Sequence, residues 1–395
     1  MLLLVAAALA LGAPAPWRAV VVGGNGRVGG STVRWLLRLA AEHGRPLHVA
    51  VGGRSAARFD ALRRALGAAG ADGRISFAPC DLDDAPSLDA ALAGVDVCVH
   101  TAGPFQSVER AHCLAAAVRN GVAYCDVCDN GALARAARDE LDAPARAAGV
   151  PAVLACGIWP GVSALMLAAA VARLPADAPI DAELSFFTAG TGNAGPAIVA
   201  ATFHLLAEPA LCVRDGVLVG LRPWSERREV PFGARVGTRS ICLLDNPDVL
   251  TAATAAPFAR RLRTLSSRFG TAPQVWNELF GVVALAPARV LLDRRAMAVV
   301  ARASEPVIRA VDRLVGATNA MRVDAAAGGR AVTLELVHPD LEDCVGLATA
   351  AFAWELLCGT VPPGVRYACE LAGTGAGDAI LTRARRGGEW REEAR

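Results

Sequence analysis

The stretch RAVVVGGNGRVGGSTVRWLL (residues 18–37) decides the fold of the amino-terminal half of this chain. It begins as an apolar run, breaks into glycines, and continues with apolar residues at helical spacing. Gly24, Gly26 and Gly29 fill the G-x-G-x-x-G pattern of a strand, turn and helix that bind a dinucleotide, with the phosphates at the positive end of the helix. We therefore predict a cofactor site that contains Gly24, Asn25, Gly26, Arg27, Val28 and Gly29.

A second predicted strand, residues 48–51, leads into Gly53, Arg54 and Ser55. An acidic residue at this place would bind the ribose 2′-hydroxyl of NAD, whereas the planar guanidinium of Arg54 suits a 2′-phosphate. We therefore predict NADP rather than NAD, in contact with these three residues. The alternative is a solvated arginine after a purely structural turn. Asp81, at the end of the next predicted strand, is expected near the adenine.

The rest of the first half alternates short apolar strands with helical stretches. The run Val95–His100 predicts a parallel strand buried on both faces, which continues into Thr101, Ala102, Gly103 and Pro104. Ligands of open α/β sheets bind outside the carboxyl ends of the strands, so we expect these four residues to contact the cofactor. Gly103–Pro104 is equally typical of a simple turn. The alternation predicts an α/β fold with a doubly wound parallel Rossmann sheet.

Composition excludes several functions. The chain has 395 residues and a formal net charge of +2 without a basic block, so neither nucleic acid nor an anionic membrane surface is indicated as a partner. We expect a small-molecule substrate instead. The sequence contains no lysine, which excludes a Walker phosphate loop, a Schiff-base lysine and the Tyr-x-x-x-Lys pair of short-chain dehydrogenases.

The 11 cysteines are an odd number in a chain too long for a disulfide scaffold, so we expect buried, reduced thiols. Cys125 and Cys128 form a C-x-x-C pair, but no second pair completes a zinc site. We therefore predict a structural role for this pair and no bound metal.

Residues 1–16 begin with an apolar run of signal-peptide length, too short to span a bilayer. The run has no basic residue before it, and the Rossmann strand begins only a few residues later. A cleaved leader, a targeting segment for a plastid or another organelle, and a misassigned start therefore all stay open, and localisation is unknown between an organelle and the cytoplasm. A second apolar stretch, Val162–Val171, predicts a buried helix, so no integral membrane span is expected.

The second half predicts a sheet with one covered face. Strands are expected at residues 180–187, 218–221, 239–243 and 332–337, and helices at 197–206 and 293–315, the second broken or kinked near Pro306. Arg295, Arg302 and Arg309 on that helix either bind a substrate carboxylate or form a solvated face. Trp224 either lines a pocket or packs.

Several motifs, in their order and spacing, resemble the saccharopine dehydrogenase-like oxidoreductases, notably the plant and algal members. In the first half they are the glycine turn, Gly53–Arg54, Asp81, and residues 100–105 (HTAGPF), 124–129 (YCDVCD) and 157–163 (GIWPGVS). In the second half they are residues 191–196 (TGNAGP), 232–237 (FGARVG), 268–273 (RFGTAP), 276–277 (WN) and 346–364. The resemblance therefore covers nearly the whole chain.

This resemblance implies an NADP-binding Rossmann domain over residues 17–175 and a second α+β domain over residues 176–344, which covers the substrate or forms a homodimer. It also implies that residues 345–380 return to the first domain, which leaves residues 381–395 as a polar tail. Many relatives read Tyr-x-Asp-x-x-Gly-Glu where this chain has Asp129 and Asn130, so no role of that glutamate is carried over.

The cofactor carries the hydride, so the protein must position the substrate and supply a proton or a charge. Asp126 is our candidate for an acid/base or for a group that orients an ammonium, and Tyr124 is a candidate proton donor; a structural role for both stays open. His100, at the end of a buried strand, is expected to be a core histidine. We predict an NADP-dependent oxidoreductase that acts on an amino-acid-derived imine or opine. The alternatives are a lipid enoyl reductase and a catalytically silent NADP-binding protein.

Overall fold

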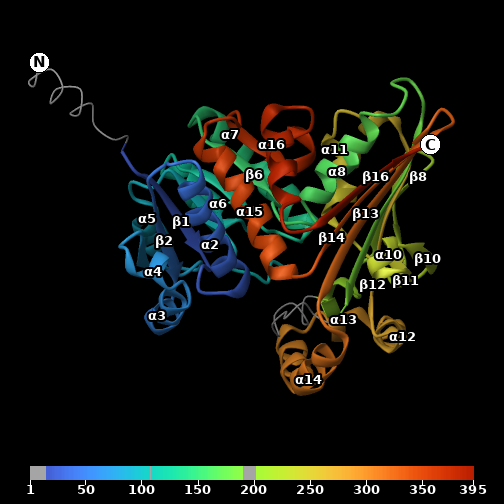
Figure 1. The fold of residues 1–395 in the computed structure, drawn as a ribbon, viewed down its shortest axis with the longest axis horizontal. Coiled ribbons are helices and arrows are strands. Elements are labelled where there is room, and N and C mark those ends of the chain that lie inside the picture. The colour runs from blue at the N-terminus through green and yellow to red at the C-terminus, as the bar shows by residue number, and fades with distance from the viewer. Residues whose placement is uncertain (1–14, 107, 190–201) are drawn as a thin grey trace, which may run out of the picture.

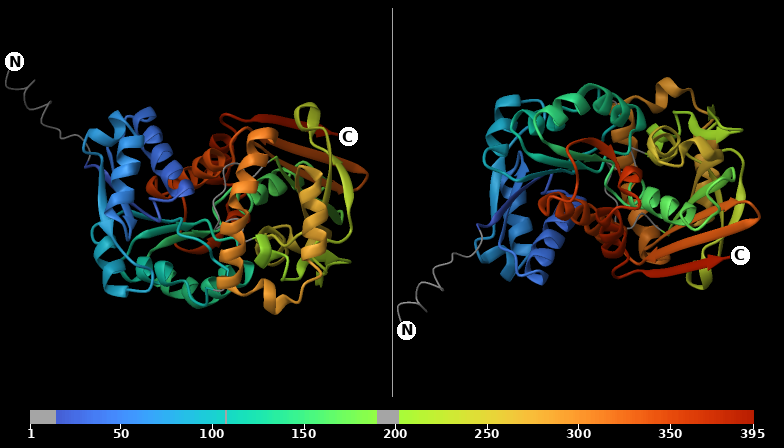
Figure 2. Two further views of the ribbon diagram at one scale, coloured as in Figure 1. Left: turned by 90° about the horizontal axis from the view of Figure 1, so that it is seen from below. Right: turned by 90° about the horizontal axis from the view of Figure 1, so that it is seen from above.

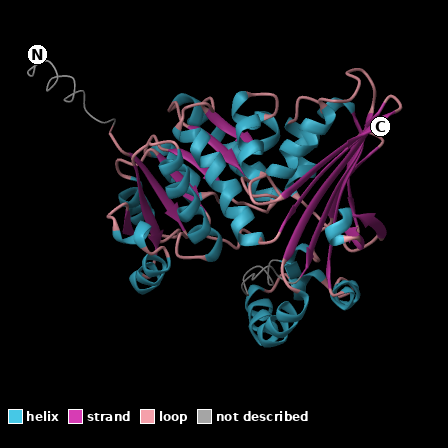
Figure 3. Cartoon of the chain, viewed as in Figure 1, coloured by secondary structure: helices cyan, strands magenta, loops and turns pink. Residues whose placement is uncertain are grey.

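The computed structural model of the chain describes residues 15–106, 108–189 and 202–395. Two sheets lie next to each other, with most helices packed between and around them (Figure 1 and Figure 3). Residues 1–14, most of the expected leader, and the TGNAGP motif at 191–196 lie outside the described residues.

The first sheet has seven parallel strands in the order β15-β6-β5-β4-β1-β2-β3. The strands are β1 (Trp17–Val22), β2 (Leu47–Gly53), β3 (Ile75–Pro79), β4 (Val97–His100), β5 (Ala123–Asp126), β6 (Pro151–Leu154) and β15 (Gly364–Tyr367). Every residue of β4 and β5 is buried, as expected for parallel strands with helices on both faces. The prediction of a doubly wound parallel sheet is confirmed.

Helices cover both faces of this sheet (Figure 2). The connecting helices are α2 (Arg27–Glu42), α3 (Ala56–Ala65), α4 (Ala68–Ala71), α5 (Ala85–Leu92), α6 (His112–Arg119) and α7 (Gly131–Ala147). The late helix α15 (Leu341–Leu357) packs along α2 and against β4 and β5. The half of the molecule that contains the parallel sheet is therefore completed by a segment from the far end of the chain.

The second sheet is mixed and follows the order β10-β11-β12-β7-β13-β14-β16, with β8 and β9 branching from β12. Its strands are β7 (Ile180–Ala189), β8 (Ala210–Arg214), β9 (Val217–Leu221), β10 (Arg228–Pro231), β11 (Thr238–Leu243), β12 (Leu262–Ala272), β13 (Thr318–Ala327), β14 (Arg330–His338) and β16 (Glu389–Ala394). Side chains alternate across these strands, so one face packs on α8 (Val162–Val171) and the other carries charged residues. As predicted, α8 is a buried helix.

The remaining helices surround this sheet. They are α10 (Gly233–Val236), α11 (Pro247–Ala255), α12 (Gln274–Val283), α13 (Ala288–Leu291), α14 (Arg294–Val315) and α16 (Gly375–Ala384), with the 3-10 turns η1 (Ala259–Arg261) and η2 (Ala368–Leu371). Of the break or kink expected near Pro306, the break is excluded, because α14 continues through that residue. The helix predicted at 197–206 lies mostly outside the described residues.

The end of the chain differs from the polar tail that we predicted. Residues 389–394 form β16, which pairs antiparallel with β14 at the edge of the second sheet. The segment is charged because it is an exposed edge strand, and Arg173 on the turn after α8 binds its Glu392. Among the described helices, none is both long and apolar enough to cross a bilayer.

Candidate functional site

The glycine turn brings three backbone segments into contact. A Cβ on Gly29 would lie 2.3 Å from the carbonyl oxygen of Gly23 and 2.7 Å from Thr101 Oγ1, so only glycine fits there. A Cβ on Gly23, which has a φ of +80°, would lie 2.7 Å from the amide nitrogen of Ala102. Gly23 is a requirement that the motif did not reveal, because it is set by the loop after β4.

The amino end of α2 is open to an anion. Its N-cap, Gly26, provides no side-chain cap, and the first turn contains no acidic residue. Asn25 donates from Nδ2 to the carbonyl of Ser55 (3.2 Å), while its buried Oδ1 has no hydrogen-bond partner among the described residues. Uncapped amides at the positive end of a helix, beside close backbone, fit the diphosphate of a dinucleotide.

The residues predicted to bind the adenosine half lie at the neighbouring strand ends. The side chain of Arg54 is 80% exposed and its Nη1 lies 4.0 Å from Oδ2 of Asp81, so the guanidinium is held near the site and remains accessible. Ser55 accepts a hydrogen bond from the amide of Arg58 and caps α3. This arrangement fits a 2′-phosphate at Arg54.

The loop after β4 lies across the turn. Thr101 donates from Oγ1 to the carbonyl of Val22 (3.0 Å), and Gly103–Pro104 is a cis peptide bond. Thr101 and Ala102 thus lie against the glycine turn, and Gly103 and Pro104 follow them at the carboxyl edge of the sheet.

His100, Tyr124 and Asp126 form a buried chain of hydrogen bonds beneath this loop. The Tyr124 hydroxyl donates to Oδ2 of Asp126 (3.1 Å) and lies 3.1 Å from Nδ1 of His100. The other oxygen of Asp126 accepts from the amides of Cys128 (3.1 Å) and Ala155 (2.8 Å). All three side chains are at most 9% exposed. The pair predicted to act on the substrate therefore also ties together the loops after β5 and β6.

Burial sets the charge of these groups. It raises the pKa of Asp126 to about 6, against the hydrogen bonds from Ala155, Cys128 and Tyr124. It lowers the pKa of His100 to about 4 and raises that of Tyr124 well above its usual range. At neutral pH His100 and Tyr124 are therefore neutral, and Asp126 is a carboxylate.

A cavity of about 50 Å³ lies where the loops after β5 and β6 meet the second sheet. Trp159 forms one wall and stacks on Phe186, with ring centroids 5.0 Å apart, while Phe269 lies 5.5 Å away. Asp129 and Asp245 line the cavity, and burial raises the pKa of both. Burial is the main cause of the raised pKa of nearby Glu208, and the charges of Asp245 and Asp129 raise it further.

Sequence reasoning did not find this cavity. Its aromatic and acidic residues come from five separate segments, and none of these segments carries a spacing pattern of its own. The residues at 157–161 and 269 were noted only as part of the family resemblance.

Trp224 and the C-x-x-C pair were also singled out in the sequence. Trp224 is buried and donates from Nε1 to the carbonyl of Asn277 (2.7 Å), so it packs. Cys125 and Cys128 are buried free thiols, and the described residues contain no group of three His, Cys, Asp or Glu arranged to hold a metal.

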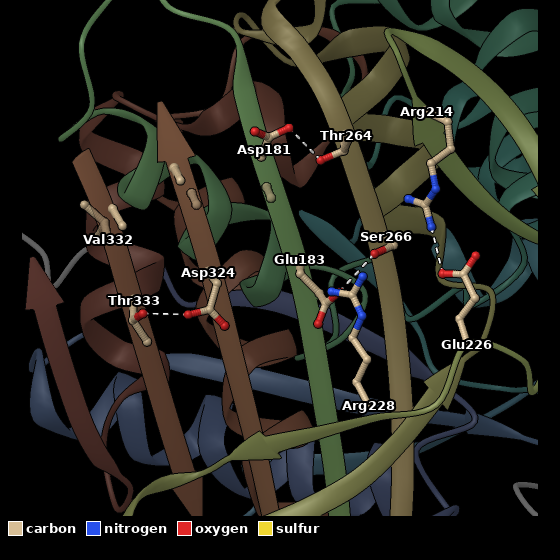
Figure 4. A pocket seen from close by; sticks show the side chains of 14 residues that line it. Asp181, Glu183, Arg214, Glu226, Arg228, Thr264, Ser266, Asp324, Val332 and Thr333 are labelled. Atoms are coloured by element: carbon tan, nitrogen blue, oxygen red, sulfur yellow. Dashed lines mark hydrogen bonds and ion pairs between the residues drawn. The ribbon is translucent and has the colours of Figure 1, made fainter. Parts of the chain in front are cut away.

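A larger cavity, about 410 Å³, opens on the charged face of the second sheet (Figure 4). Its charges are paired within the protein. Glu183 binds Arg228 and Arg268, and Asp324 binds Arg322 and Thr333. We assign it no part in the cofactor site.

Comparisons with known proteins agree with this geometry. Residues 19–153 match the family model described as the saccharopine dehydrogenase NADP binding domain, which covers about a third of the chain. No curated protein sequence matches.

Among solved structures, the apo saccharopine dehydrogenase (L-Glu forming) of Saccharomyces cerevisiae is similar over 96% of this chain and 100% of its own, with a TM-score of 0.64 and 14% identity. That likeness shows a shared fold. The structure of Pen from Bacillus thuringiensis covers 35% of this chain and 48% of its own, at 16% identity and a TM-score of 0.28.

Proposed function

We propose, from the premise that this chain is a saccharopine dehydrogenase-like protein with an NADP-binding first domain, that it is an oxidoreductase acting on amino-acid-derived imines or opines. In the reducing direction, NADPH gives a hydride to the imine carbon and a proton goes to the nitrogen, which leaves an amine and NADP⁺. The glycine turn, Arg54 and residues 101–104 would bind the cofactor.

The cavity between Trp159 and the acidic pair Asp129 and Asp245 is the observation that carries this proposal. Carboxylates beside aromatic faces stabilise a cation, and a volume of about 50 Å³ accepts an ammonium group rather than a chain. A buried carboxylate with a raised pKa is stabilised when a cation binds beside it. These features support recognition of an amine at the edge that holds the cofactor.

The arginines of α14 support the other half of such a substrate. Burial raises the pKa of Glu342 to about 7, against the positive charges of Arg27 and Arg309. Oε1 of Glu342 lies 3.3 Å from Nη1 of Arg27 in the first turn of α2. Arg302 would attract a substrate carboxylate, and Arg309, which pairs with Glu305 on the same helix, would add its charge. The alternative interpretation is that Arg302 and Arg309 belong to a solvated face of α14.

Tyr124 and Asp126 would position the loops around the reacting centre. Every oxygen of the Asp126 carboxylate already accepts a hydrogen bond from this chain. A direct acid/base role would require the Tyr124 bond to exchange for one to the substrate.

Substrate panels test the proposal. We expect NADPH oxidation with 2-oxo acids plus amines, and Asp129→Asn with Asp245→Asn should raise KM for the amine about tenfold or more while the affinity for NADPH stays unchanged. Asp60→Asn is the control, since Asp60 pairs only with Arg63 on the surface.

A lipid enoyl reductase is the second candidate, favoured by the exposed aliphatic side chains of α12 to α14. Turnover with enoyl thioesters alone would replace the first proposal with this one. Tight NADPH binding without turnover on either panel would favour a catalytically silent protein.

A further inference from the structure

Large apolar side chains are exposed at one place on this protein. Of the eleven that are exposed among the described residues, ten lie between residues 275 and 314, on α12, α13, α14 and the turns between them. They are Val275, Leu279, Val282, Leu285, Val290, Leu292, Val299, Val300, Val307 and Leu314, which we call the aliphatic surface. Such a concentration on a monomer marks a surface that binds something.

The aliphatic surface is not the inner side of these helices. Leu291, Met297 and Ala301 are buried in a small core that they share with Trp224 and Leu244. Val300, Val307 and Leu314 repeat every seven residues along another side of α14, and Leu314 is 87% exposed. The helix thus carries a second apolar stripe that nothing in the described chain covers.

Arginines line the other side of the exposed part of this helix. Arg295, Arg302 and Arg309 also repeat every seven residues, in a row about 140–160° around α14 from the stripe, and Arg313 lies in the next turn. Residues 284–316 contain six arginines and three acidic residues, whereas the net charge of the whole chain is only +2. The net positive charge of the protein is therefore concentrated on this segment, which the overall charge does not reveal.

The composition favours a lipid surface over a protein partner. All eleven exposed side chains are valine or leucine, while protein interfaces are enriched in aromatic residues and methionine. A helix with an exposed apolar face and arginines on another side is typical of helices that lie in the interface of an anionic membrane. The three helices also project together beyond the edge of the second sheet, where a flat surface can reach them (Figure 1 and Figure 2).

We propose that α12, α13 and α14 form a docking surface for anionic lipid, with the aliphatic side chains inserted among the acyl chains and the arginines against the headgroups. The protein would bind reversibly and without a spanning helix. This proposal departs from our expectation, based on the net charge alone, that no anionic membrane surface is a partner. The proposal does not depend on the reaction that the cofactor edge supports.

Vesicle co-sedimentation of the full chain tests it. We expect binding to vesicles of equal parts phosphatidylcholine and phosphatidylglycerol, and weak binding to phosphatidylcholine alone. Leu285→Asp with Val307→Asp should lower binding about tenfold or more, and Arg313→Gln about fivefold. Val217→Asp is the matched control, because Val217 is 60% exposed on β9 and Val307 is 58% exposed.

Two results would overturn the proposal. Binding that the double variant leaves unchanged would place the lipid contact elsewhere. A dimer that forms without vesicles, dissociates in the double variant and does not bind vesicles would make the aliphatic surface an interface between two copies. The affinity for NADPH shows that each variant is folded, and Leu285→Ser with Val307→Ser replaces the aspartates if the first pair fails this check.

Discussion

The carboxyl edge of the first sheet, the candidate cofactor edge, depends on different contacts at its two ends. At the end formed by β1, α2 and β2, backbone approaches backbone, and the limiting contacts are those that a Cβ would make at Gly23 and Gly29. At the end formed by β4, β5 and β6, side chains meet side chains, in the chain His100, Tyr124 and Asp126 and in the cavity beside Trp159. The first end depends on shape, and the second depends on which groups are charged.

The largest effect is expected where backbone shape decides, at Gly29 of α2, and its neighbour Gly30 provides the control. Gly29→Ala would place a Cβ 2.3 Å from a backbone oxygen that cannot move alone. We expect a loss of about 3 kcal/mol in unfolding free energy and of NADPH binding. Gly30→Ala is the control, since its Cβ would come closest to the end of the Leu62 side chain, at 3.1 Å, and would lie at an ordinary 3.7 Å from the carbonyl oxygen of Gly24. Calorimetry and NADPH titration measure both variants, and similar losses for the two would contradict the contact.

This contrast explains what could be predicted from the sequence. The glycine turn, the residues after β2 and the loop after β4 were found because backbone requirements leave glycines at fixed spacing, and parallel strands leave apolar runs. Strands β8, β10, β12, β13, β15 and β16 were not predicted, because β15 and β16 join their sheets from the far end of the chain and the others lie in a mixed sheet with an exposed charged face.

The electrostatics could not be predicted from the sequence, because a pKa depends on neighbours from several elements. Asp126 has a pKa of about 6, and so does Asp248, which accepts hydrogen bonds from Ser163 and the amide of Gly161 at the start of α8. A raised pKa therefore follows from burial here, and it does not by itself mark Asp126 as an acid/base.

The second prediction concerns pH. The folded pKa of Asp126, about 6, lies above the ordinary 3.8, so its contribution to stability is present below pH 4 and is lost as the pH rises through 6. The folded pKa of His100, about 4, lies below 6.5, so its contribution is present above pH 6.5 and is lost as the pH falls through 4. Each amounts to about 3 kcal/mol, with opposite sign.

Single variants separate the two contributions. Relative to Asp126→Asn, the wild type should lose about 3 kcal/mol of unfolding free energy between pH 4 and 6; relative to His100→Gln it should gain a similar amount as the pH rises from 4 to 6.5. Denaturant unfolding at several pH values measures both differences. Turnover of Asp126→Asn supplies the second readout: activity retained would fit a positioning role, and a loss of more than about a hundredfold would fit an acid/base.

The smallest effect is expected at Arg54. This residue is a charged side chain at the end of the edge that otherwise depends on backbone shape. Its guanidinium is accessible and lies 4.0 Å from the Asp81 carboxylate, so we expect it to contribute a charge to cofactor binding and little to the fold. Arg54→Ala should weaken NADPH binding roughly ten- to a hundredfold, about 1.5–3 kcal/mol, and leave NADH binding unchanged, because only NADPH carries the 2′-phosphate. Arg58→Ala, an exposed arginine in the first turn of α3, controls for the loss of general positive charge. Equal losses for both coenzymes would show that Arg54 acts through the shape of the turn after β2. In that case the end of the edge formed by β1, α2 and β2 would depend on backbone shape alone.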